Sequence, residues 1–411
     1  MVKKIISFTL FFCFLASCNS TKNMVSVNQQ KIIKPNGETL KLKGVNLGNW
    51  LLPEGYILKL KDCDSPRKLD QAIRELIGNT AATQFWDNYL ENYITEPDIE
   101  WLAKTGINLV RLPFDYRLLT NDDYLGRDNH GFEYIDKTIE WCKKYNLYVL
   151  LDMHGAPGGQ TGANIDNSDG YPWLMLDQGM QQKTCEVWQN IAKRYKNEPT
   201  VIGYNLLNEP VAHFFKEDNI DQYLEPLYKK ITASIREVDK KHLIFIGGSM
   251  WETDFSIFNE PFDDKLVYSF HKYWQPVVQE QVQSYVDYRE KYNVPIFMGE
   301  SGENEDVWVN DFRALLDKNN IHWTFWPYKK MDNTRAPMQF KLPKNYDKFI
   351  TYADSNRSSY DLIRQLKDSI TGIDRKSIQI ILNEMIENMK FENCTPNTGY
   401  CKALLFNGFT D

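Results

Sequence analysis

Eight short, mostly apolar segments, separated by stretches with helical periodicity, constrain the fold of this chain more than any other feature. The apolar segments lie at residues 44–48, 107–113, 147–153, 201–207, 243–247, 266–270, 295–299 and 321–326. Helical patterns lie between and after them, at residues 84–105, 133–145, 178–197, 220–239, 276–292, 305–319 and 359–371. Short runs that are apolar along their whole length are typical of strands in a parallel sheet, where both faces of the sheet are buried.

This alternation predicts an α/β fold, and its strand–helix units fit a (β/α)8 TIM barrel with enlarged loops. An open, doubly wound sheet is the structural alternative, but no Gly-x-Gly-x-x-Gly motif follows the first strand to support its nucleotide-binding form. Two apolar runs around Asn36-Gly37 predict an N-terminal β-hairpin before the barrel. We expect one barrel domain over residues 31–372 and a short helical extension over residues 373–411.

The N-terminus has the pattern of an export signal. Two lysines, Lys3 and Lys4, precede an apolar run over residues 5–16, which is too short to span a bilayer. The sequence Leu-Ala-Ser-Cys that ends at Cys18 resembles the lipobox of bacterial lipoproteins. This resemblance implies that residues 1–17 are removed as a signal peptide and that residues 18–30 form a polar tether. It also implies that a lipid on Cys18 anchors an exported protein in a membrane, facing the periplasm or the cell surface.

Cysteine usage and net charge set limits on the compartment and the partners. Cys394 and Cys401 flank a turn-rich loop in the extension and are candidates for a disulfide in an oxidising compartment. The net charge of −7 argues against a nucleic-acid partner, because phosphate binding needs a basic surface. We therefore expect no nucleic acid as partner, and contact with a membrane only through the N-terminal lipid.

Polar and aromatic side chains gather at the carboxyl ends of the predicted strands, where the chemistry of (β/α)8 barrels takes place. In strand order they are Arg111, Asp152, His154, Asn208, Glu209, His271, Tyr273, Glu300 and Trp326. Each alone has a structural explanation, such as a buried ion pair or a hydrogen-bonded strand end. Together, so many polar groups at one rim cost stability unless they serve one another or a ligand.

Glu209 and Glu300 are the candidate catalytic pair. The barrel brings both to its mouth, and hydrolysis of a glycosidic bond requires two carboxyl groups that flank the bond. One protonates the leaving oxygen, and the other attacks the anomeric carbon or activates a water. We expect Arg111 to keep Glu300 ionised, because a nearby cation lowers the pKa of a carboxyl group. We also expect Tyr273 to donate a hydrogen bond to Glu300.

A metal site is the rival interpretation of the same rim. Its ligands would be Asp152, His154, Glu209, His271 and Glu300. These residues come one or two to a strand, without His-Glu-x-x-His or paired-histidine spacing, and Arg111 would repel a cation. We therefore expect neither a metal nor an organic cofactor.

The complete set resembles glycoside hydrolase family 5, the cellulase family of retaining (β/α)8 barrels. The resemblance covers about residues 30–371 and rests on eight positions in barrel order: Arg111, His154, Asn208, Glu209, His271, Tyr273, Glu300 and Trp326. It implies that Glu209, within Asn208-Glu209-Pro210, is the acid/base and that Glu300, after Gly299, is the nucleophile. The other six positions are expected to bind substrate.

Two loop segments resemble the exo-β-1,3-glucanase branch of that family most closely. They are residues 44–51 (GVNLGNWL) and 154–162 (HGAPGGQTG), and in that branch the second helps to close a glucose pocket. The resemblance implies a retaining enzyme that cleaves β-glucosidic bonds of glucans by double displacement, as an exo-β-1,3-glucanase or β-glucosidase. Residues 325–330 depart from that branch, so an endo-β-1,4-glucanase of the same family is the alternative. A carbohydrate-binding lipoprotein without activity is a third interpretation, which the presence of both glutamates disfavours.

Three further tryptophans lie just beyond predicted strand ends: Trp50, Trp173 and Trp274. Because an indole ring offers a flat apolar face to a sugar, we expect all three to contact substrate. Trp323 alternates with Trp326 along the last strand, so it is expected to point away from the barrel and to pack against the outer helices.

Overall fold

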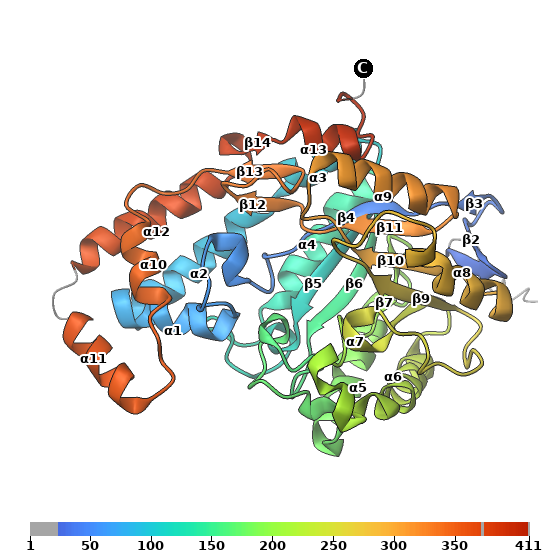
Figure 1. Cartoon of the computed structure of the whole chain (residues 1–411), viewed down its shortest axis with the longest axis horizontal. Helices are drawn as coiled ribbons and strands as arrows, with labels where there is room; N and C mark the ends of the chain where they lie inside the picture. The colour runs from blue at the N-terminus through green and yellow to red at the C-terminus, as the bar shows by residue number, and fades with distance from the viewer. Residues whose placement is uncertain (1–23, 371–373, 410–411) are drawn as a thin grey trace, which may run out of the picture.

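Eight parallel strands close into a barrel in the computed structural model of the chain, which describes residues 24–370 and 374–409. Figure 1 shows them at the centre of the molecule. They are β4 (Lys43–Asn46), β5 (Leu109–Asp115), β6 (Tyr148–Gly155), β7 (Val201–Asn205), β8 (Leu243–Gly247), β9 (Leu266–His271), β10 (Ile296–Glu300) and β11 (His322–Phe325). Strand β11 pairs with β4, so the sheet has no open edge. The predicted (β/α)8 barrel is confirmed.

Helices surround the barrel and extend beyond one end of it. They are α1 (Pro66–Ile77), α2 (Asn79–Tyr93), α3 (Glu96–Lys104), α4 (Gly131–Lys144), α5 (Gln178–Tyr195), α6 (Leu224–Val238), α7 (Ser249–Glu252), α8 (Glu280–Tyr292), α9 (Asp306–Lys318), α10 (Asp347–Ala353), α11 (Tyr360–Ile370), α12 (Arg375–Met389) and α13 (Thr398–Ala403). The helix predicted over 84–105 was wrong in extent. It is divided between α2 and α3, because Thr95 and Asp98 form a capping box that starts a new helix.

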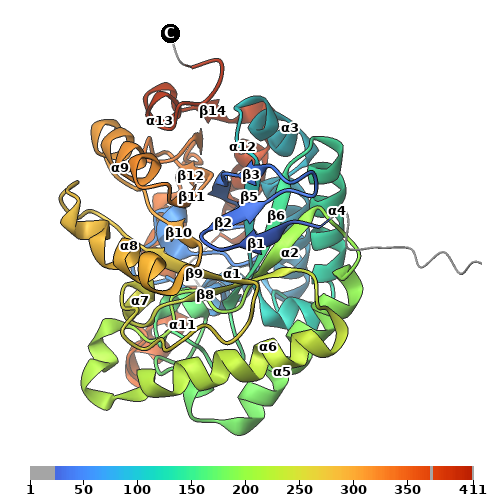
Figure 2. The same ribbon diagram turned by 90° about the vertical axis from the view of Figure 1, so that its right-hand side faces the viewer.

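A small antiparallel sheet precedes the barrel. It consists of β1 (Ser26–Asn28), β2 (Lys31–Ile33) and β3 (Thr39–Leu40), and the pairing of β2 with β3 confirms the predicted hairpin. The tether predicted over residues 18–30 was wrong at its end, because β1 pairs with β2. Figure 2 shows this sheet across one end of the barrel. Apolar side chains from the sheet segment and from the barrel strands form one buried cluster there: Val25, Ile32, Leu40, Leu42, Leu109, Leu150, Ile202, Leu243, Phe245, Val267 and Phe297.

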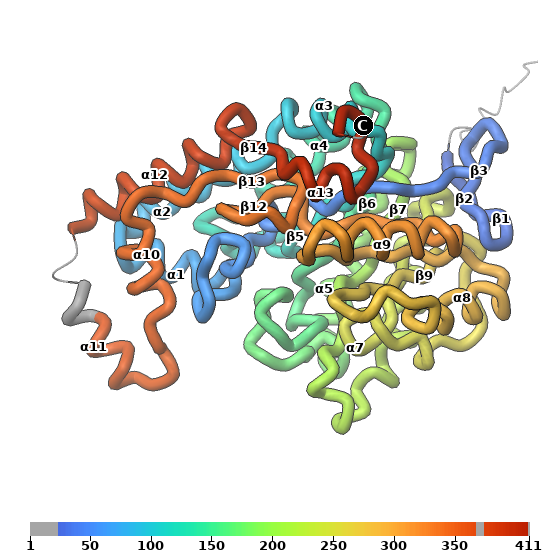
Figure 3. The backbone as a smooth tube through the Cα atoms, turned by 45° about the horizontal axis from the view of Figure 1, so that its top comes forward, coloured from blue at the N-terminus to red at the C-terminus, as the bar shows by residue number. Residues whose placement is uncertain are grey.

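The C-terminal extension packs onto the barrel. Strand β14 (Thr395–Pro396) adds to a sheet that also contains β12 (Lys329–Met331) and β13 (Met338–Phe340). Helix α13 lies beside α9, as Figures 1 and 3 both show, and Nε of Arg313 in α9 donates to the carbonyl of Ala403 at 2.9 Å. The buried ammonium of Lys329 donates to the carbonyl of Met389, at the end of α12. The boundary expected at residue 372 therefore separates no independent unit from the barrel.

The predicted disulfide between Cys394 and Cys401 is wrong, because both thiols are free. The Sγ atom of Cys394 faces the last turn of α12 and lies 3.4 Å from the carbonyl of Met389. Helix α13 begins between the two cysteines and turns Cys401 into the core, where its Sγ lies 3.5 Å from the carbonyl of Pro337.

The predicted signal peptide and Cys18 lie outside the described residues. Among residues 24–370 and 374–409, no helix combines the length and the apolar character that crossing a bilayer requires.

Candidate active site

A cavity of about 690 Å³ lies at the carboxyl end of the barrel. Segments that follow different strands form its wall, so residues far apart in the sequence meet there. Predicted site residues among its lining are His154, Glu209, His271, Tyr273, Trp274, Glu300 and Trp326. Other lining residues include Glu54, Tyr56, Ala163, Asn164, Ile165, Trp251, Lys272, Glu303, Lys330 and Arg335.

Glu300, at the end of β10, is held at both carboxylate oxygens. Nη1 of Arg111 lies 2.5 Å from Oε1, and the hydroxyl of Tyr273 donates to Oε2 at 3.1 Å. Burial raises the pKa of Tyr273 well above its usual value, so this phenol remains a donor. Burial also raises the pKa of Glu300, while Arg111 lowers it. The expectation that Arg111 and Tyr273 would keep Glu300 ionised did not take into account burial, which raises the pKa of Glu300 and is the larger effect.

Arg111 is fully buried and joins several elements of the site. Its guanidinium contacts side-chain oxygens of Asn46, Asp152, Asn205, Asn208 and Glu300, at distances of 2.5 to 3.0 Å. Each of these acceptors comes from the carboxyl end of a strand or from the residues just after it. The cation thus neutralises two buried carboxylates and fixes the amide of Asn208 beside the cavity.

Replacement of Arg111 by methionine is expected to lower the free energy of unfolding at pH 7 by about 3–5 kcal/mol, because Asp152 and Glu300 would remain buried without a cation. The loss should be smaller at pH 5, where the uncompensated carboxyl groups can take up protons. Urea denaturation at both pH values measures it. Arg67→Met, which removes an exposed ion pair with Asp169, is the matched control and should change stability by less than about 1 kcal/mol. Equal losses in both variants would contradict the prediction.

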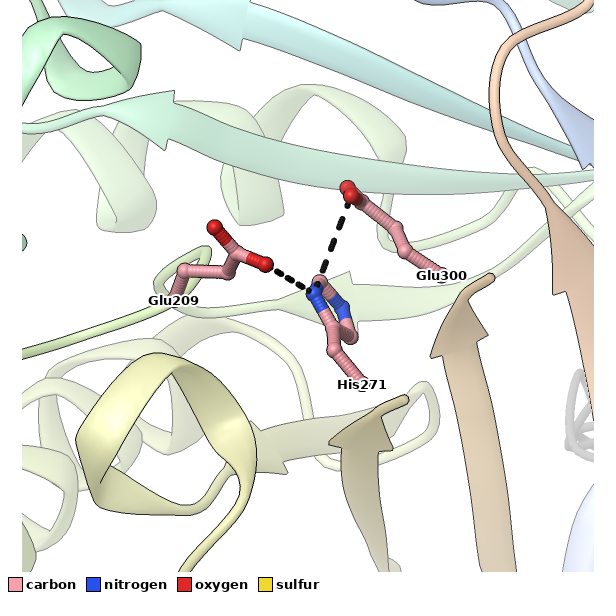
Figure 4. Close-up of side chains that lie close together, drawn as sticks. All are labelled: Glu209, His271 and Glu300. Carbon is pink, nitrogen blue, oxygen red and sulfur yellow. Dashed lines mark hydrogen bonds and ion pairs between the residues drawn. The ribbon is translucent and has the colours of Figure 1, made fainter. Parts of the chain in front are cut away.

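Glu209 points toward His271 with one of its oxygens, as Figure 4 shows. Oε1 of Glu209 lies 2.8 Å from Nδ1 of His271, and Nδ1 lies 3.7 Å from Oε2 of Glu300. Burial and the negative charge of Glu300 raise the pKa of Glu209 well above its usual value. Burial and the charge of Arg111 lower the pKa of His271, so its imidazole is neutral. Glu209 is thus suited to hold a proton while it lies beside the carboxyl group of Glu300.

The backbone of Glu209 lies in the left-handed region, with φ of 44°. The loop after β6 holds it there. Nε2 of Gln160 donates to the carbonyl of Asn208, and the hydroxyl of Thr161 donates to the carbonyl of Glu209, both at 2.8 Å. Non-glycine residues adopt this conformation only where the surroundings fix it, and such positions cluster at functional sites. The same loop contributes Ala163, Asn164 and Ile165 to the cavity wall.

His154 and Trp326 form one wall beside the carboxylates. Their rings are stacked, with centroids 5.3 Å apart and planes inclined by 7°. Oδ2 of Asp152 accepts from Nδ1 of His154 at 2.8 Å, and Nδ2 of Asn208 donates to Nε2 of the same ring at 3.2 Å. The structure therefore brings together all eight positions on which the family resemblance rests.

The three additional tryptophans have different surroundings. Trp50 is fully buried and donates from Nε1 to the carbonyl of Leu90, so its predicted contact with substrate is wrong. Trp173 is 51% exposed and is not among the residues that line the cavity, so its contact with substrate stays a prediction. Trp274 lines the cavity and is 65% exposed, as a substrate contact would need. Trp323 is buried in the core, as predicted.

Several residues of the site were not anticipated from the sequence. Glu54 is buried beside His154, and its Oε1 has no hydrogen-bond partner in the part of the chain that the structure describes. Tyr56 accepts from Nε1 of Trp326 at 2.7 Å, and Glu303 forms an ion pair with Lys330 on the cavity wall. Glu54 lies in the loop that follows β4, at the end of the barrel where the other site residues lie. That position was the signal in the sequence that could have identified it as a site residue.

One group of three potential metal ligands occurs within the described ranges: Glu209, His271 and Glu300, with one atom of each within 4.8 Å of the others. Arg111 already neutralises Glu300. Asp152 and His154, the other two candidate ligands of the metal interpretation, contact each other and do not join the group. The donor set fits an acid/base pair better than a cation site. The absence of a metal stays a prediction.

A (β/α)8 barrel with two adjacent carboxyl groups at the carboxyl end of its strands defines a glycosidase, which hydrolyses O-glycosyl bonds. Residues 70–332 match the family described as cellulase, glycosyl hydrolase family 5. The chain belongs to this family.

Known proteins similar to this chain include several glycosidases. One is a β-xylosidase of Phanerodontia chrysosporium, 27% identical over 74% of this chain and 70% of the relative. Endoglucanase C of Acetivibrio thermocellus is 29% identical over 60% of this chain and 88% of its own length. Glucan 1,3-beta-glucosidase 2 of Wickerhamomyces anomalus is 30% identical over 78% of this chain and 73% of the relative.

Solved structures share the fold. The match to endoglucanase Cel5A of Thermotoga maritima includes 76% of this chain and 96% of the endoglucanase chain, with a TM-score of 0.51 and 18% sequence identity. An endogalactoceramidase covers 93% of this chain with 84% of its own, with a TM-score of 0.59 and 18% identity.

Proposed function

We propose that this glycosidase retains the anomeric configuration, with Glu300 as nucleophile and Glu209 as acid/base. The observation that carries the proposal is their separation: an oxygen of each lies within 4.8 Å of the other. Retaining pairs lie about 5–5.5 Å apart, whereas inverting pairs lie about 6.5–9.5 Å apart to admit a water. The different surroundings of the two carboxyl groups support this distribution of roles.

In the first step, a carboxylate oxygen of Glu300 attacks the anomeric carbon as the bond to the leaving oxygen breaks. Glu209 gives its proton to that oxygen, and a covalent glycosyl-enzyme forms. Arg111 and Tyr273 hold Glu300 in position for the attack. Burial of Glu209 next to another carboxylate favours its protonated form before this step.

In the second step, Glu209 is ionised and removes a proton from water. The resulting hydroxyl oxygen attacks the anomeric carbon, the bond to Glu300 breaks, and Glu209 is protonated again. His154 and Trp326 line the cavity as polar and flat contacts for the sugar, and the amide of Asn208 lies directly behind them, against His154. No metal or cofactor is required by this sequence of steps.

The proposed substrate is a β-glucan cleaved from a chain end, as by an exo-β-1,3-glucanase or β-glucosidase. Two of the similar proteins carry glucan-related names, an endoglucanase and a glucan 1,3-beta-glucosidase. The loop of residues 163–165 and the unpartnered carboxyl oxygen of Glu54 support an enclosed sugar site. An endo-β-1,4-glucanase is the second candidate, supported by a relative that this chain matches over 88% of its length.

Digestion of laminarin and of carboxymethyl cellulose tests the substrate proposal. With laminarin we expect glucose to accumulate before the average chain length falls, because a closed sugar site admits only a chain end. We expect little loss of viscosity with carboxymethyl cellulose. A rapid fall in viscosity before glucose appears would favour the endo-acting alternative. Xylan and xylobiose complete the panel, and faster release of xylose than of glucose would reject the glucan proposal.

We propose that the protein is exported and anchored by a lipid on Cys18. The support is the sequence alone: a basic and apolar leader that ends in Leu-Ala-Ser-Cys. Cys18→Ser is expected to release the protein from the membrane fraction or to block its processing. Cys13→Ser, within the apolar run, is the matched control. If Cys18→Ser fractionates and is processed like the parent, the lipid-anchor proposal is rejected.

A further inference from the structure

Glu252, at the end of α7, is a buried carboxyl group that the proposed mechanism does not use. Its Oε1 accepts the backbone N–H of Glu209 at 3.1 Å. Its Oε2 lies 3.4 Å from Nε2 of His271, on the side of the ring away from Glu209. Within the described residues, both atoms are buried and neither Oε2 nor Nε2 has a partner at hydrogen-bonding geometry. The hydroxyl of Ser269 is the other neighbour of the Glu252 carboxyl group, and it lowers the pKa of Glu252. Oε2 of Glu252 and Nε2 of His271 face each other at 3.4 Å, and a small shortening of that distance would form a hydrogen bond between them.

Two glycines make room for this arrangement. A Cβ at Gly247 would lie 2.3 Å from Cδ of Glu252, and a Cβ at Gly299 would lie 2.8 Å from Nε2 of His271. Glu252 also ends a run of left-handed residues, with φ of 54°, 56° and 59° at Met250, Trp251 and Glu252. Backbone in this region is unfavourable for non-glycine residues and persists where the surroundings require it. The carboxyl group of Glu252 can lie next to His271 only because of the two glycines and the left-handed backbone before it.

The neutral imidazole of His271 carries only one N–H, so it can donate either to Glu209 from Nδ1 or to Glu252 from Nε2, but not to both. Burial raises the pKa of Glu252 to about 8. At neutral pH, Glu252 is therefore protonated and can donate to Nε2, which must then be an acceptor. The titratable or charged groups that influence Glu252 are Arg111, Asp152, Glu209, Tyr228, His271 and Tyr285.

We propose that Glu252 is a positioning residue for the acid/base: its protonated carboxyl group donates to Nε2 of His271, so that the Nδ1–H of His271 donates to Oε1 of Glu209. This inference rests on the proposed role of Glu209. With Oε1 occupied by the imidazole, the transferable proton of Glu209 resides on Oε2. In Figure 4 that oxygen points away from His271. The same carboxyl group fixes the backbone of Glu209 through its N–H, so one residue sets both the position and the protonated oxygen of the acid.

The proposal predicts a change of tautomer with pH. When Glu252 loses its proton near pH 8, it becomes an acceptor, and the imidazole turns its single N–H toward Glu252. Nδ1 then offers a lone pair to Glu209, and the proton of Glu209 moves to Oε1. Glu252→Gln prevents this change. Its amide oxygen still accepts the N–H of Glu209, so its amide nitrogen faces Nε2 and donates at every pH.

Nitrogen-15 NMR of the histidine rings tests the inference without relying on activity. The chain has six histidines, and His271→Asn identifies the signal that belongs to His271. We expect the Nδ1–H tautomer in the parent at pH 6.5, conversion to the Nε2–H tautomer through about pH 8, and no conversion in Glu252→Gln. An Nε2–H tautomer in the parent at pH 6.5 overturns the proposal. Conversion at the same pH in Glu252→Gln overturns it as well.

Hydrolysis of two aryl β-glucosides tests the consequence for catalysis. With phenyl β-glucoside, whose leaving group needs a proton, Glu252→Gln should move the alkaline loss of kcat/KM upward by about one pH unit. With 2,4-dinitrophenyl β-glucoside, which needs no proton, the alkaline limb should not move. A residue that served only packing would leave both profiles unchanged, and that result would overturn the positioning role. If Glu209→Ala lowered kcat/KM equally on both aryl β-glucosides, the proposed acid/base role of Glu209 would be rejected instead. The NMR result on the tautomer of His271 does not depend on that role.

Discussion

Glu300→Ala is expected to reduce kcat/KM on every β-glucoside by roughly 10⁴-fold or more, because the variant lacks the nucleophile that we propose for the first step. The loss should be similar for phenyl and dinitrophenyl β-glucosides, since both need the nucleophile. Added azide can occupy the space that the side chain leaves. It would attack the anomeric carbon of the dinitrophenyl substrate once, so the expected product is the α-glucosyl azide.

Proton NMR of the glycosyl azide identifies the anomer. Glu303→Ala is a matched control, because it removes another carboxylate of the cavity wall that pairs with Lys330 rather than with Arg111. It should retain activity within about tenfold of the parent. A β-glucosyl azide from Glu300→Ala would show that the roles of Glu209 and Glu300 are reversed.

The barrel and the residues at its rim could be predicted because both depend on short sequence patterns. A strand buried on both faces appears as an apolar run, and a polar residue at its end, such as Glu209 or Glu300, is conspicuous against it. The closed topology then places distant strand ends at one rim without further information. The break between α2 and α3 was also local, in the capping box of Thr95 and Asp98, but the helical periodicity on either side concealed it.

What could not be predicted depends on how segments pack against one another. Trp50 follows a strand end like Trp274, but its ring is fully buried and contacts Tyr134. Nothing in the adjacent sequence distinguishes the two. Cys394 and Cys401 are spaced as a loop disulfide would be, yet α13 directs their thiols to different neighbours. Glu252 lies in a short irregular segment, and its proximity to His271 follows only from the three-dimensional arrangement.

Electrostatics at the site also depend on burial, which the sequence indicates poorly. Counting charges near Glu300 predicts a lowered pKa, because Arg111 is the nearest charged group. In the structure, burial acts in the opposite direction and has the larger effect. The same burial affects Glu209, which has His271 rather than an arginine at its carboxyl oxygen. The difference between the two carboxyl groups therefore comes from their partners, and these partners support the roles that we propose for them.

Glu209→Ala is expected to separate substrates by their leaving groups. For phenyl β-glucoside the loss in kcat/KM should be about 10²–10⁴-fold, because the leaving oxygen has no acid to protonate it. For 2,4-dinitrophenyl β-glucoside the glycosyl-enzyme should still form, since that leaving group departs as a stable anion. Its hydrolysis should then be slow, because the same residue activates water in the second step.

Accumulation of the glycosyl-enzyme on Glu300 makes this outcome visible. Mass spectrometry of the variant mixed with the dinitrophenyl substrate should show an added glucosyl group, and stopped-flow absorbance should show a burst of dinitrophenolate. Azide, which needs no general base, should restore turnover and give the β-glucosyl azide after two inversions. Equal losses on both substrates, without a burst, would mean that Glu209 does not act on the leaving group. The α-glucosyl azide from this variant would place the nucleophile at Glu209 instead.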